Sequence, residues 1–233
     1  MSPLALTLGD PAGIGPEIVF KAWSQLRASG PAFVVVGDFQ ALASASGSGM
    51  HTVRRVTTPK QGAEVFSQVL PVLDIPLRSP VVAGQPSSAA APAIIRWIET
   101  GVGLALSGAV SGLVTAPIAK APLYEAGFQF PGHTEFLGEL TASANYQGAR
   151  GPIMMLAVEG LRTTLVTVHE PLSKVGGLLS VDKIVNAGMV TAQALRSDFG
   201  IEAPRLAVAG FNPHAGEDGS IGREEVEIIA PAV

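Results

Sequence analysis

The chain has 233 residues, of which 47% are hydrophobic and 15% charged, and this composition favours a packed, sheet-rich interior over disorder. The net charge of −4 comes without a basic stripe, so neither a nucleic-acid partner nor an anionic membrane surface is expected. Cysteine is absent, which excludes disulfides and thiolate metal sites and leaves His, Asp and Glu as metal ligands.

Two apolar segments have to be weighed as targeting or membrane signals. Residues 1–10 lack a basic region before their short apolar run, so we expect a first strand rather than a signal peptide, and a cytoplasmic protein. Residues 101–119 carry no charge and approach the length of a membrane span. Their glycines, serines and Pro117 instead indicate the end of a helix, a turn and a buried strand over residues 109–115.

Strand and helix patterns alternate along the first half of the chain. An apolar run at residues 4–8 is typical of a strand, and a glycine-rich turn leads from it to a helix with apolar positions at helical spacing up to Leu26. Ser87 is expected to cap a long helix through Ile98. The other expected elements are a strand at 33–36, a short helix and loop at 41–49, short strands around Val53 and at 70–73, the strand at 109–115, and a short helix ending at Gly127.

The second half of the chain adds helices and one hairpin. The expected elements are a helix at 135–142, a hairpin of strands 153–158 and 161–168, a helix at 181–199 and a strand at 205–209. This alternation predicts an α/β fold with a mixed, mainly parallel sheet and helices on both faces. Residues 223–233 begin a helix with acidic residues in its first turn and then stop without a cap, so we expect a longer parent protein.

The turn at residues 9–17 joins the first strand to the first helix. Its glycines allow close approach of the backbone to a ligand, and Pro16 suits a first helical turn. The spacing is not that of the dinucleotide-binding fingerprint, and Asp38 is the only acidic residue near a second-strand ribose position. A structural turn and a nucleotide contact therefore both remain open.

Two histidines, His169 and His214, each close an apolar, strand-like run. Because ligands of an open parallel sheet bind outside the carboxyl ends of its strands, we expect these imidazoles to lie at strand ends, where they could converge. They suit a divalent ion, with Glu170, Glu217 or Asp218 as carboxylate ligands or supporting groups. The alternative is that the two histidines are unrelated and the acids are solvated.

His133 and Thr134 stand at the start of an expected helix. Free backbone N–H groups, a hydroxyl and an imidazole could together hold a phosphate or carboxylate there. The alternative is ordinary helix capping by Thr134, with His133 in solvent. Lys120 follows another strand end and could attract an acidic substrate, although a plain surface lysine is the simpler interpretation.

Read together, these segments resemble the 4-hydroxythreonine-4-phosphate dehydrogenase family of vitamin B6 biosynthesis. The matching segments follow the family's order across essentially the whole chain, and jointly they are specific. They are Leu8-Gly9-Asp10-Pro11-Ala12-Gly13-Ile14-Gly15-Pro16-Glu17, Val114-Thr115-Ala116-Pro117-Ile118-Ala119-Lys120, Pro131-Gly132-His133-Thr134-Glu135-Phe136, Asn212-Pro213-His214-Ala215-Gly216-Glu217 and Gly222-Arg223-Glu224-Glu225.

The resemblance implies a fold similar to isocitrate and isopropylmalate dehydrogenases, with two subdomains around an active-site cleft, here residues 1–128 and 129–233. It implies a homodimer with the active site at the subunit boundary, NAD as hydride acceptor, and zinc, magnesium or cobalt as the metal. By this resemblance His133 and Thr134 contact substrate, and His169 and His214 bind the metal. The family's third metal-binding histidine, and its substrate-binding Lys, Asn and Arg, lie beyond the end of this sequence.

The activity implied is oxidation of 4-phosphooxy-L-threonine with decarboxylation to 3-amino-2-oxopropyl phosphate, in pyridoxal phosphate biosynthesis. A related dehydrogenase acting on another hydroxy acid phosphate, such as an erythronate phosphate, or on a dihydrodiol carboxylate is the second hypothesis. A third is a non-catalytic module that binds metal or phosphate. The sequence identifies neither the general base nor the residues that bind NAD.

Overall fold

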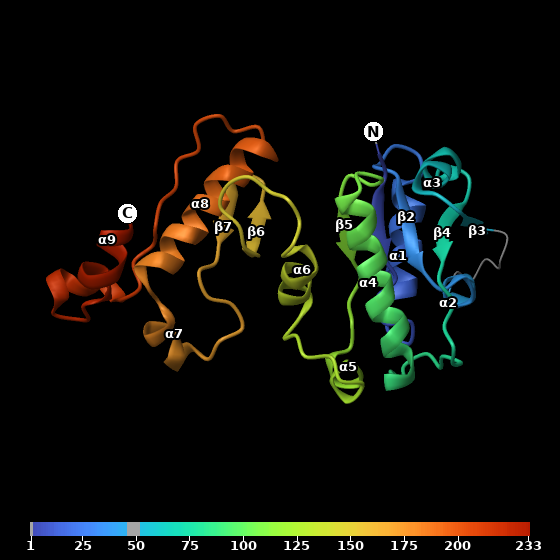
Figure 1. Cartoon of the computed structure of the whole chain (residues 1–233), viewed down its shortest axis with the longest axis horizontal. Helices are drawn as coiled ribbons and strands as arrows, with labels where there is room; N and C mark the ends of the chain where they lie inside the picture. Colours follow the sequence, from blue (N-terminus) through green and yellow to red (C-terminus); the bar gives the residue numbers. More distant parts are fainter. Residues whose placement is uncertain (1, 46–51) are drawn as a thin grey trace. The chain divides into compact units, whose positions relative to one another are not determined.

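The computed structural model describes residues 2–45 and 52–233, and the chain divides into two compact units, Met1–Gly132 and His133–Val233 (Figure 1). This division lies a few residues after the boundary at residue 128 that the sequence predicts. The part of the expected helix and loop at 41–49 that follows Ala45 lies outside the described residues.

The first unit is built on a sheet of five strands in the order β3-β4-β2-β1-β5, and every neighbouring pair is parallel (Figure 1). The central strand β2 is buried along its whole length, because helices cover a parallel sheet and apolar runs fill its interior. The mainly parallel α/β fold is thereby confirmed. The strands are β1 (Leu4–Thr7), β2 (Phe33–Gly37), β3 (Val53–Val56), β4 (Leu70–Asp74) and β5 (Leu113–Thr115).

Helices of the first unit pack on this sheet through two tryptophans that also satisfy their indole N–H groups. Trp97 is fully buried and donates to the carbonyl of Ile75, whereas Trp23 donates to the carbonyl of Phe66. The helices are α1 (Gly15–Leu26), α2 (Phe39–Ala45), α3 (Pro59–Val65), α4 (Ala91–Leu106), which continues a 3₁₀ turn at Ser88–Ala90, and α5 (Lys120–Glu125). Ser87 caps the 3₁₀ turn through its hydroxyl, as expected.

One helix in the described part of the chain, Ser88–Leu106, is long and apolar enough to cross a membrane. Its apolar residues Ile94, Trp97 and Ile98 are buried, and α4 packs against β1 and β2. Such a helix is equally expected in the core of an α/β unit. The apolar stretch at 101–119 divides as predicted into the end of α4, a turn and β5.

Two expectations for the first unit need correction. The strand predicted at 109–115 is only Leu113–Thr115, since the N–H groups of Ala109 and Val110 bond back to the carbonyl of Leu104 and close the end of α4. Val114 is also 43% exposed, so this strand is not buried. Helix α3 was not predicted, although Thr58 caps it by accepting from the N–H of Gln61, the spacing of a capping box.

The second unit contains helices and an antiparallel hairpin, which confirms the predicted hairpin, although its strands are shorter than the predicted 153–158 and 161–168. The hairpin strands pair from Met155 with Thr164 to Val158 with Leu161. The elements are α6 (His133–Thr141), β6 (Met155–Val158), β7 (Leu161–Thr164), α7 (Leu172–Leu178), α8 (Val181–Ser197), a tight turn at Pro213–Gly219, a π-helical turn at Glu225–Ile229 and α9 (Ala230–Ala232).

The strand predicted at 205–209 is not formed, and the second hairpin strand ends at Thr164 instead of Val168. Beyond Thr164 the hairpin is continued by a bond from the N–H of Leu165 to the carbonyl of Met154. Leu206 and Val208 are each 45% exposed. Apolar, β-branched sequence becomes a strand only where a neighbouring strand satisfies its N–H and C=O groups, and the described residues provide none there.

Two helical glycines of the first unit should respond to alanine with opposite sign. A Cβ on Gly15 would lie 2.1 Å from the carbonyl oxygen of Leu8, whereas one on Gly103 in α4 meets nothing within 4 Å. Gly15→Ala should therefore lower the free energy of unfolding by about 1–3 kcal/mol. Gly103→Ala should raise it by about 0.5–1 kcal/mol by lowering the entropy of the unfolded chain.

The measurement is urea unfolding followed by fluorescence, since both tryptophans of the chain lie in the first unit. Equal effects of the two substitutions would contradict the close packing of Gly15 on the end of β1.

Candidate functional site

The glycine-rich turn after β1 is fixed by the segment that follows β5. Gly9 has a φ of +73°, and a Cβ there would lie 2.4 Å from the carbonyl oxygen of Pro117. The N–H of Asp10 donates to the same oxygen at 2.8 Å, and the Asp10 carboxylate accepts from the N–H of Ala12. Two sequence motifs are thus brought into contact, and glycine is required here for the approach of one backbone to another.

Asp38, the residue considered for a ribose contact, has both carboxylate oxygens committed to the backbone. Oδ1 accepts from the N–H of Ala41 at 2.6 Å and Oδ2 from the N–H of Leu77 at 2.9 Å, and the residue is 6% exposed. A cavity of about 720 Å³ opens beside it, lined also by Glu17 and Arg78. The carboxylate therefore anchors the start of α2 and the loop after β4, which supports the structural interpretation of this region over a nucleotide contact.

His133 and Thr134 begin α6, as the sequence predicts for a helix start. Both are half-buried, so the alternative with His133 in solvent does not hold. Next to them, one carboxylate oxygen of Glu135 is buried without a hydrogen-bond partner among the described residues. The N–H groups at a helix N-terminus favour negative charge, which Glu135 in the first turn already supplies, and binding of an anionic substrate group by His133 and Thr134 stays a prediction.

His169 and His214 are not at strand ends, because neither preceding segment is a strand. Both are exposed, with the side chain of His214 76% accessible, and no hydrogen bond or ion pair joins them. Among the described residues, no three His, Asp or Glu side chains form a group able to hold a metal ion. The prediction of strand-end placement is wrong, whereas that of metal binding remains a prediction.

The two histidines do share an uncommon backbone conformation. His169 has a φ of +58° and His214 a φ of +52°, and in the described chain every other non-glycine residue at positive φ lies next to His214: Ala215, Glu217 and Asp218. Residues 214–218, which include Gly216, together form a left-handed turn. This conformation costs about 1–2 kcal/mol per non-glycine residue, so the surrounding structure must enforce it.

The residues that hold the left-handed turn are Asn212, Glu224 and Glu225. Glu225 Oε1 accepts from the N–H groups of Phe211 at 2.8 Å and Asn212 at 2.6 Å. The Asn212 amide nitrogen donates to Glu225 Oε2 at 2.9 Å and to Glu224 Oε2 at 2.6 Å. We call these three residues the Asn212 clamp. These residues lie in segments that match the family, but their role is not evident from the sequence, because the contacts span 12–14 residues.

Helix α7 links the neighbourhoods of the two histidines. It begins three residues after His169, and a Cβ on its Gly176 would lie 3.5 Å from the ring of Phe211 and 3.7 Å from Glu224 Oε1. Phe211 is itself bonded through its N–H to the clamp. The backbone elements next to His169 and His214 therefore pack on each other.

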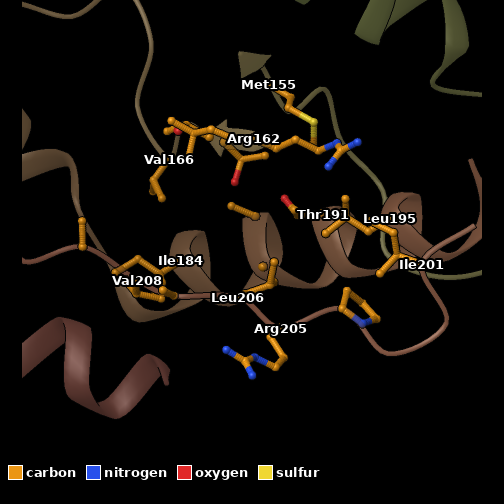
Figure 2. Close-up of a pocket in the computed structure, with 18 of the residues that line it drawn as sticks. Met155, Arg162, Val166, Ile184, Thr191, Leu195, Ile201, Arg205, Leu206 and Val208 are labelled. Carbon is orange, nitrogen blue, oxygen red and sulfur yellow. The ribbon is translucent and has the colours of Figure 1, made fainter. Parts of the chain in front are cut away.

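A second cavity, of about 660 Å³, lies within the second unit between the hairpin, α8 and residues 204–209 (Figure 2). Figure 2 shows Met155 and Arg162 of the hairpin across from Thr191 and Leu195 of α8. The cavity adjoins the segment that was expected to be a strand. None of the four predicted site residues lines it, so it is separate from the candidate site.

Comparisons with known proteins match nearly the whole chain. Residues 30–233 match the family described as Pyridoxal phosphate biosynthetic protein PdxA. The 4-hydroxythreonine-4-phosphate dehydrogenase of Caulobacter vibrioides is 68% identical over 231 residues, which cover 99% of this chain and 69% of the relative. That of Zymomonas mobilis is 44% identical and covers 100% of this chain and 68% of the relative.

Solved structures also align with nearly the whole chain. The crystal structure of 4-hydroxythreonine-4-phosphate dehydrogenase from Klebsiella pneumoniae aligns with a TM-score of 0.84 and 36% identity, over 100% of this chain and 71% of that one. A terephthalate 1,2-cis-dihydrodiol dehydrogenase from Burkholderia xenovorans aligns with a TM-score of 0.63 and 25% identity, over 99% of this chain and 68% of that one.

Fold and relatives together define an oxidoreductase with a dehydrogenase-like α/β fold. More narrowly, the chain belongs to the PdxA family of pyridoxal phosphate biosynthetic proteins.

The anchoring role of Asp38 predicts a loss of stability in Asp38→Asn. The new NH₂ group would face a backbone N–H of Ala41 or Leu77, leaving a buried donor unsatisfied, which costs about 1–3 kcal/mol of unfolding free energy. Glu64→Gln on the exposed face of α3 is the control and should change it by less than about 0.5 kcal/mol. Urea unfolding measures both, and an unchanged midpoint for Asp38→Asn would argue against the anchor.

Hydrogen bonds from Asn212 hold the pKa of Glu225 below the ordinary 4.5, and those from Asn212 lower the pKa of Glu224 as well. A lowered folded-state pKa means that the ionised group stabilises the fold above the ordinary pKa, and that this contribution disappears as pH falls through the folded value. Asn212 amide signals in NMR spectra should therefore shift with a midpoint below pH 4.5. The midpoint should be absent or moved in Glu225→Gln, and a midpoint above 4.5 in the wild type would contradict the clamp.

Proposed function

We propose that this protein is a divalent-metal- and NAD-dependent dehydrogenase that oxidises 4-phosphooxy-L-threonine. The product loses carbon dioxide to give 3-amino-2-oxopropyl phosphate for pyridoxal phosphate biosynthesis. Family membership and the names of the similar proteins support this proposal. With it we propose a cytoplasmic homodimer with a shared active site and a small phosphorylated substrate.

The observation that carries the proposal is the left-handed backbone at His169 and His214. Non-glycine residues at positive φ are uncommon, and in the described chain they occur only in the two segments that hold these histidines. Backbone strain of this kind persists where the surrounding structure enforces it, and it concentrates at binding and catalytic sites. Two separate segments that share this conformation and a histidine are better explained by one ligand than by chance.

The donor chemistry of these residues fits part of a metal site. Neutral imidazoles suit Zn²⁺ or Co²⁺, and a carboxylate such as Glu217, whose Oε1 lies 3.8 Å from His214 Nδ1, also suits Mg²⁺. The described residues offer no complete ligand set, so His169 and His214 would supply part of it. When bound, a divalent ion polarises the substrate hydroxyl and stabilises negative charge on oxygen during decarboxylation.

The other proposed roles belong to His133 and Thr134. At the start of α6 they would bind and orient an anionic group of the substrate, with the helix N–H groups aimed at the same place. NAD supplies the two-electron acceptor. We assign it no residues, since the Asp38 carboxylate is fully engaged with the backbone.

A second candidate is a related dehydrogenase with a different substrate. The similarity to the terephthalate dihydrodiol dehydrogenase favours a cyclic dihydrodiol carboxylate as that substrate. Both substrate classes carry a hydroxyl to be oxidised and an acidic group, so the two candidates share the metal and differ in what His133 and Thr134 contact.

The experiment is an NADH-formation assay with Zn²⁺, Mg²⁺ or Co²⁺, comparing 4-phosphooxy-L-threonine, an erythronate phosphate and a dihydrodiol carboxylate. His169→Ala and His214→Ala should each lower kcat/KM on the order of 100-fold, since each removes a metal ligand. Thr134→Val should mainly raise KM, by roughly tenfold, because it removes a contact made in the ground state as well.

His51→Ala serves as a matched histidine control, since no motif includes His51, and it should retain wild-type kinetics. Preference for the dihydrodiol would select the second candidate. No turnover of any of these substrates by the metal-loaded protein would reject both.

A further inference from the structure

We propose that the Asn212 clamp positions His214 for metal binding, and that Glu225 is its central positioning residue. The inference rests on the proposed function, in which His214 is a metal ligand. It goes further by assigning a role to three residues that do not themselves touch the metal. Three observations support it: the hydrogen bonds of the clamp, the close packing of the turn on these polar groups, and the exposure of the His214 ring.

First, the clamp engages the amide nitrogen of Asn212 and both carboxylate oxygens of Glu225 in hydrogen bonds. The amide nitrogen of Asn212 has two hydrogens and directs its bonds to two carboxylates, of Glu224 and Glu225. Glu225 in turn uses both oxygens, one for two backbone N–H groups and the other for the Asn212 side chain. Charge-assisted bonds of this kind are stronger than neutral ones, so they fix the backbone two residues before His214.

The second step is that the left-handed turn closes directly over the clamp. A Cβ on Gly216 would lie 2.8 Å from Glu225 Oε2 and 3.0 Å from the carbonyl oxygen of Gly222. A Cβ on Gly222 would lie 2.5 Å from the Asn212 amide nitrogen, and the N–H of Ile221 donates to the carbonyl of Gly216. The path of residues 212–222 is therefore shaped around these polar groups.

The third step is that the His214 side chain has little support of its own. It is 76% accessible, and Glu217, whose Oε1 lies 3.8 Å from its Nδ1, is itself 55% accessible and belongs to the same turn. The position of the ring is thus set by the backbone. Without the clamp, non-glycine residues relax from left-handed to right-handed or extended conformations, and the ring moves with them.

The test is titration of the protein with Co²⁺ alone, followed by its visible d–d absorption, which reports both affinity and coordination geometry. Glu225→Gln keeps the shape of the side chain but sets an NH₂ group against a donor of the clamp. We expect a dissociation constant about tenfold higher and an altered d–d spectrum, as for other supporting residues of metal sites. Gly216→Ala, which pushes a methyl group towards Glu225, should act in the same direction.

The matched control is Glu227→Gln, two positions further along the same helical turn. Among the described residues the Glu227 carboxylate pairs with the exposed Arg223 and with no residue of the clamp. This variant therefore removes the same charge without touching the clamp, and its affinity and spectrum should stay as in the wild type. Circular dichroism and melting temperature verify folding. A lower melting temperature with unchanged Co²⁺ spectrum and affinity would reduce the clamp to a structural feature and overturn the inference.

The His214→Ala variant distinguishes a failure of the positioning inference from a failure of the proposed function. If His214→Ala weakens Co²⁺ binding and Glu225→Gln does not, the positioning inference is rejected while the proposed function stands. If His214→Ala leaves binding unchanged, His214 is no ligand and both are rejected. Equal weakening by Glu227→Gln and Glu225→Gln would show a general charge effect and would also reject the inference.

Discussion

Loops that carry the motifs of this chain depend on carboxylates that accept hydrogen bonds from backbone N–H groups. Asp10 does so for the turn after β1, and Asp38 for the start of α2 and the chain after β4. Asp74 accepts from the N–H of Phe39, and Glu225 from two N–H groups before His214. Irregular backbone has no ladder to satisfy its polar groups, so side-chain acceptors decide which loop conformations persist.

This arrangement separates acidic residues that build the scaffold from those available for chemistry. Asp10 and Asp38 are 5% and 6% exposed and bonded to the backbone, although acids near strand ends are the first candidates for ligand contacts. Glu217 is exposed and beside His214, yet it has no bond to the clamp. A place after a strand therefore does not by itself mark an acid of this chain for ligand contacts, because Asp10 and Asp38 are bonded to the backbone.

Much of the fold follows from the sequence, and the exceptions have physical causes. The strands β1 and β2 and helices α1 and α8 are evident from apolar periodicity, because burial on one face or both sets that pattern. Helix α3 was missed despite its capping signal, since seven residues are too few for periodicity to show. Residues 205–209 were expected as a strand because an apolar pattern indicates burial. A strand also needs a neighbouring strand to pair with, and the pattern does not show whether one is present.

Less of the candidate site than of the fold can be predicted from the sequence. His133, Thr134, His169 and His214 are recognisable from the sequence by residue type and motif, but the backbone conformation of the two metal candidates is not. Local preference opposes positive φ at Ala215 and Glu217, so any prediction from neighbouring residues gives a right-handed or extended turn. The opposing contribution comes from Glu225, 13 residues after Asn212 in the chain. A turn of this kind exists only when tertiary contacts outweigh local preference, and for that reason the conformation at His214 cannot be predicted from the residues next to it.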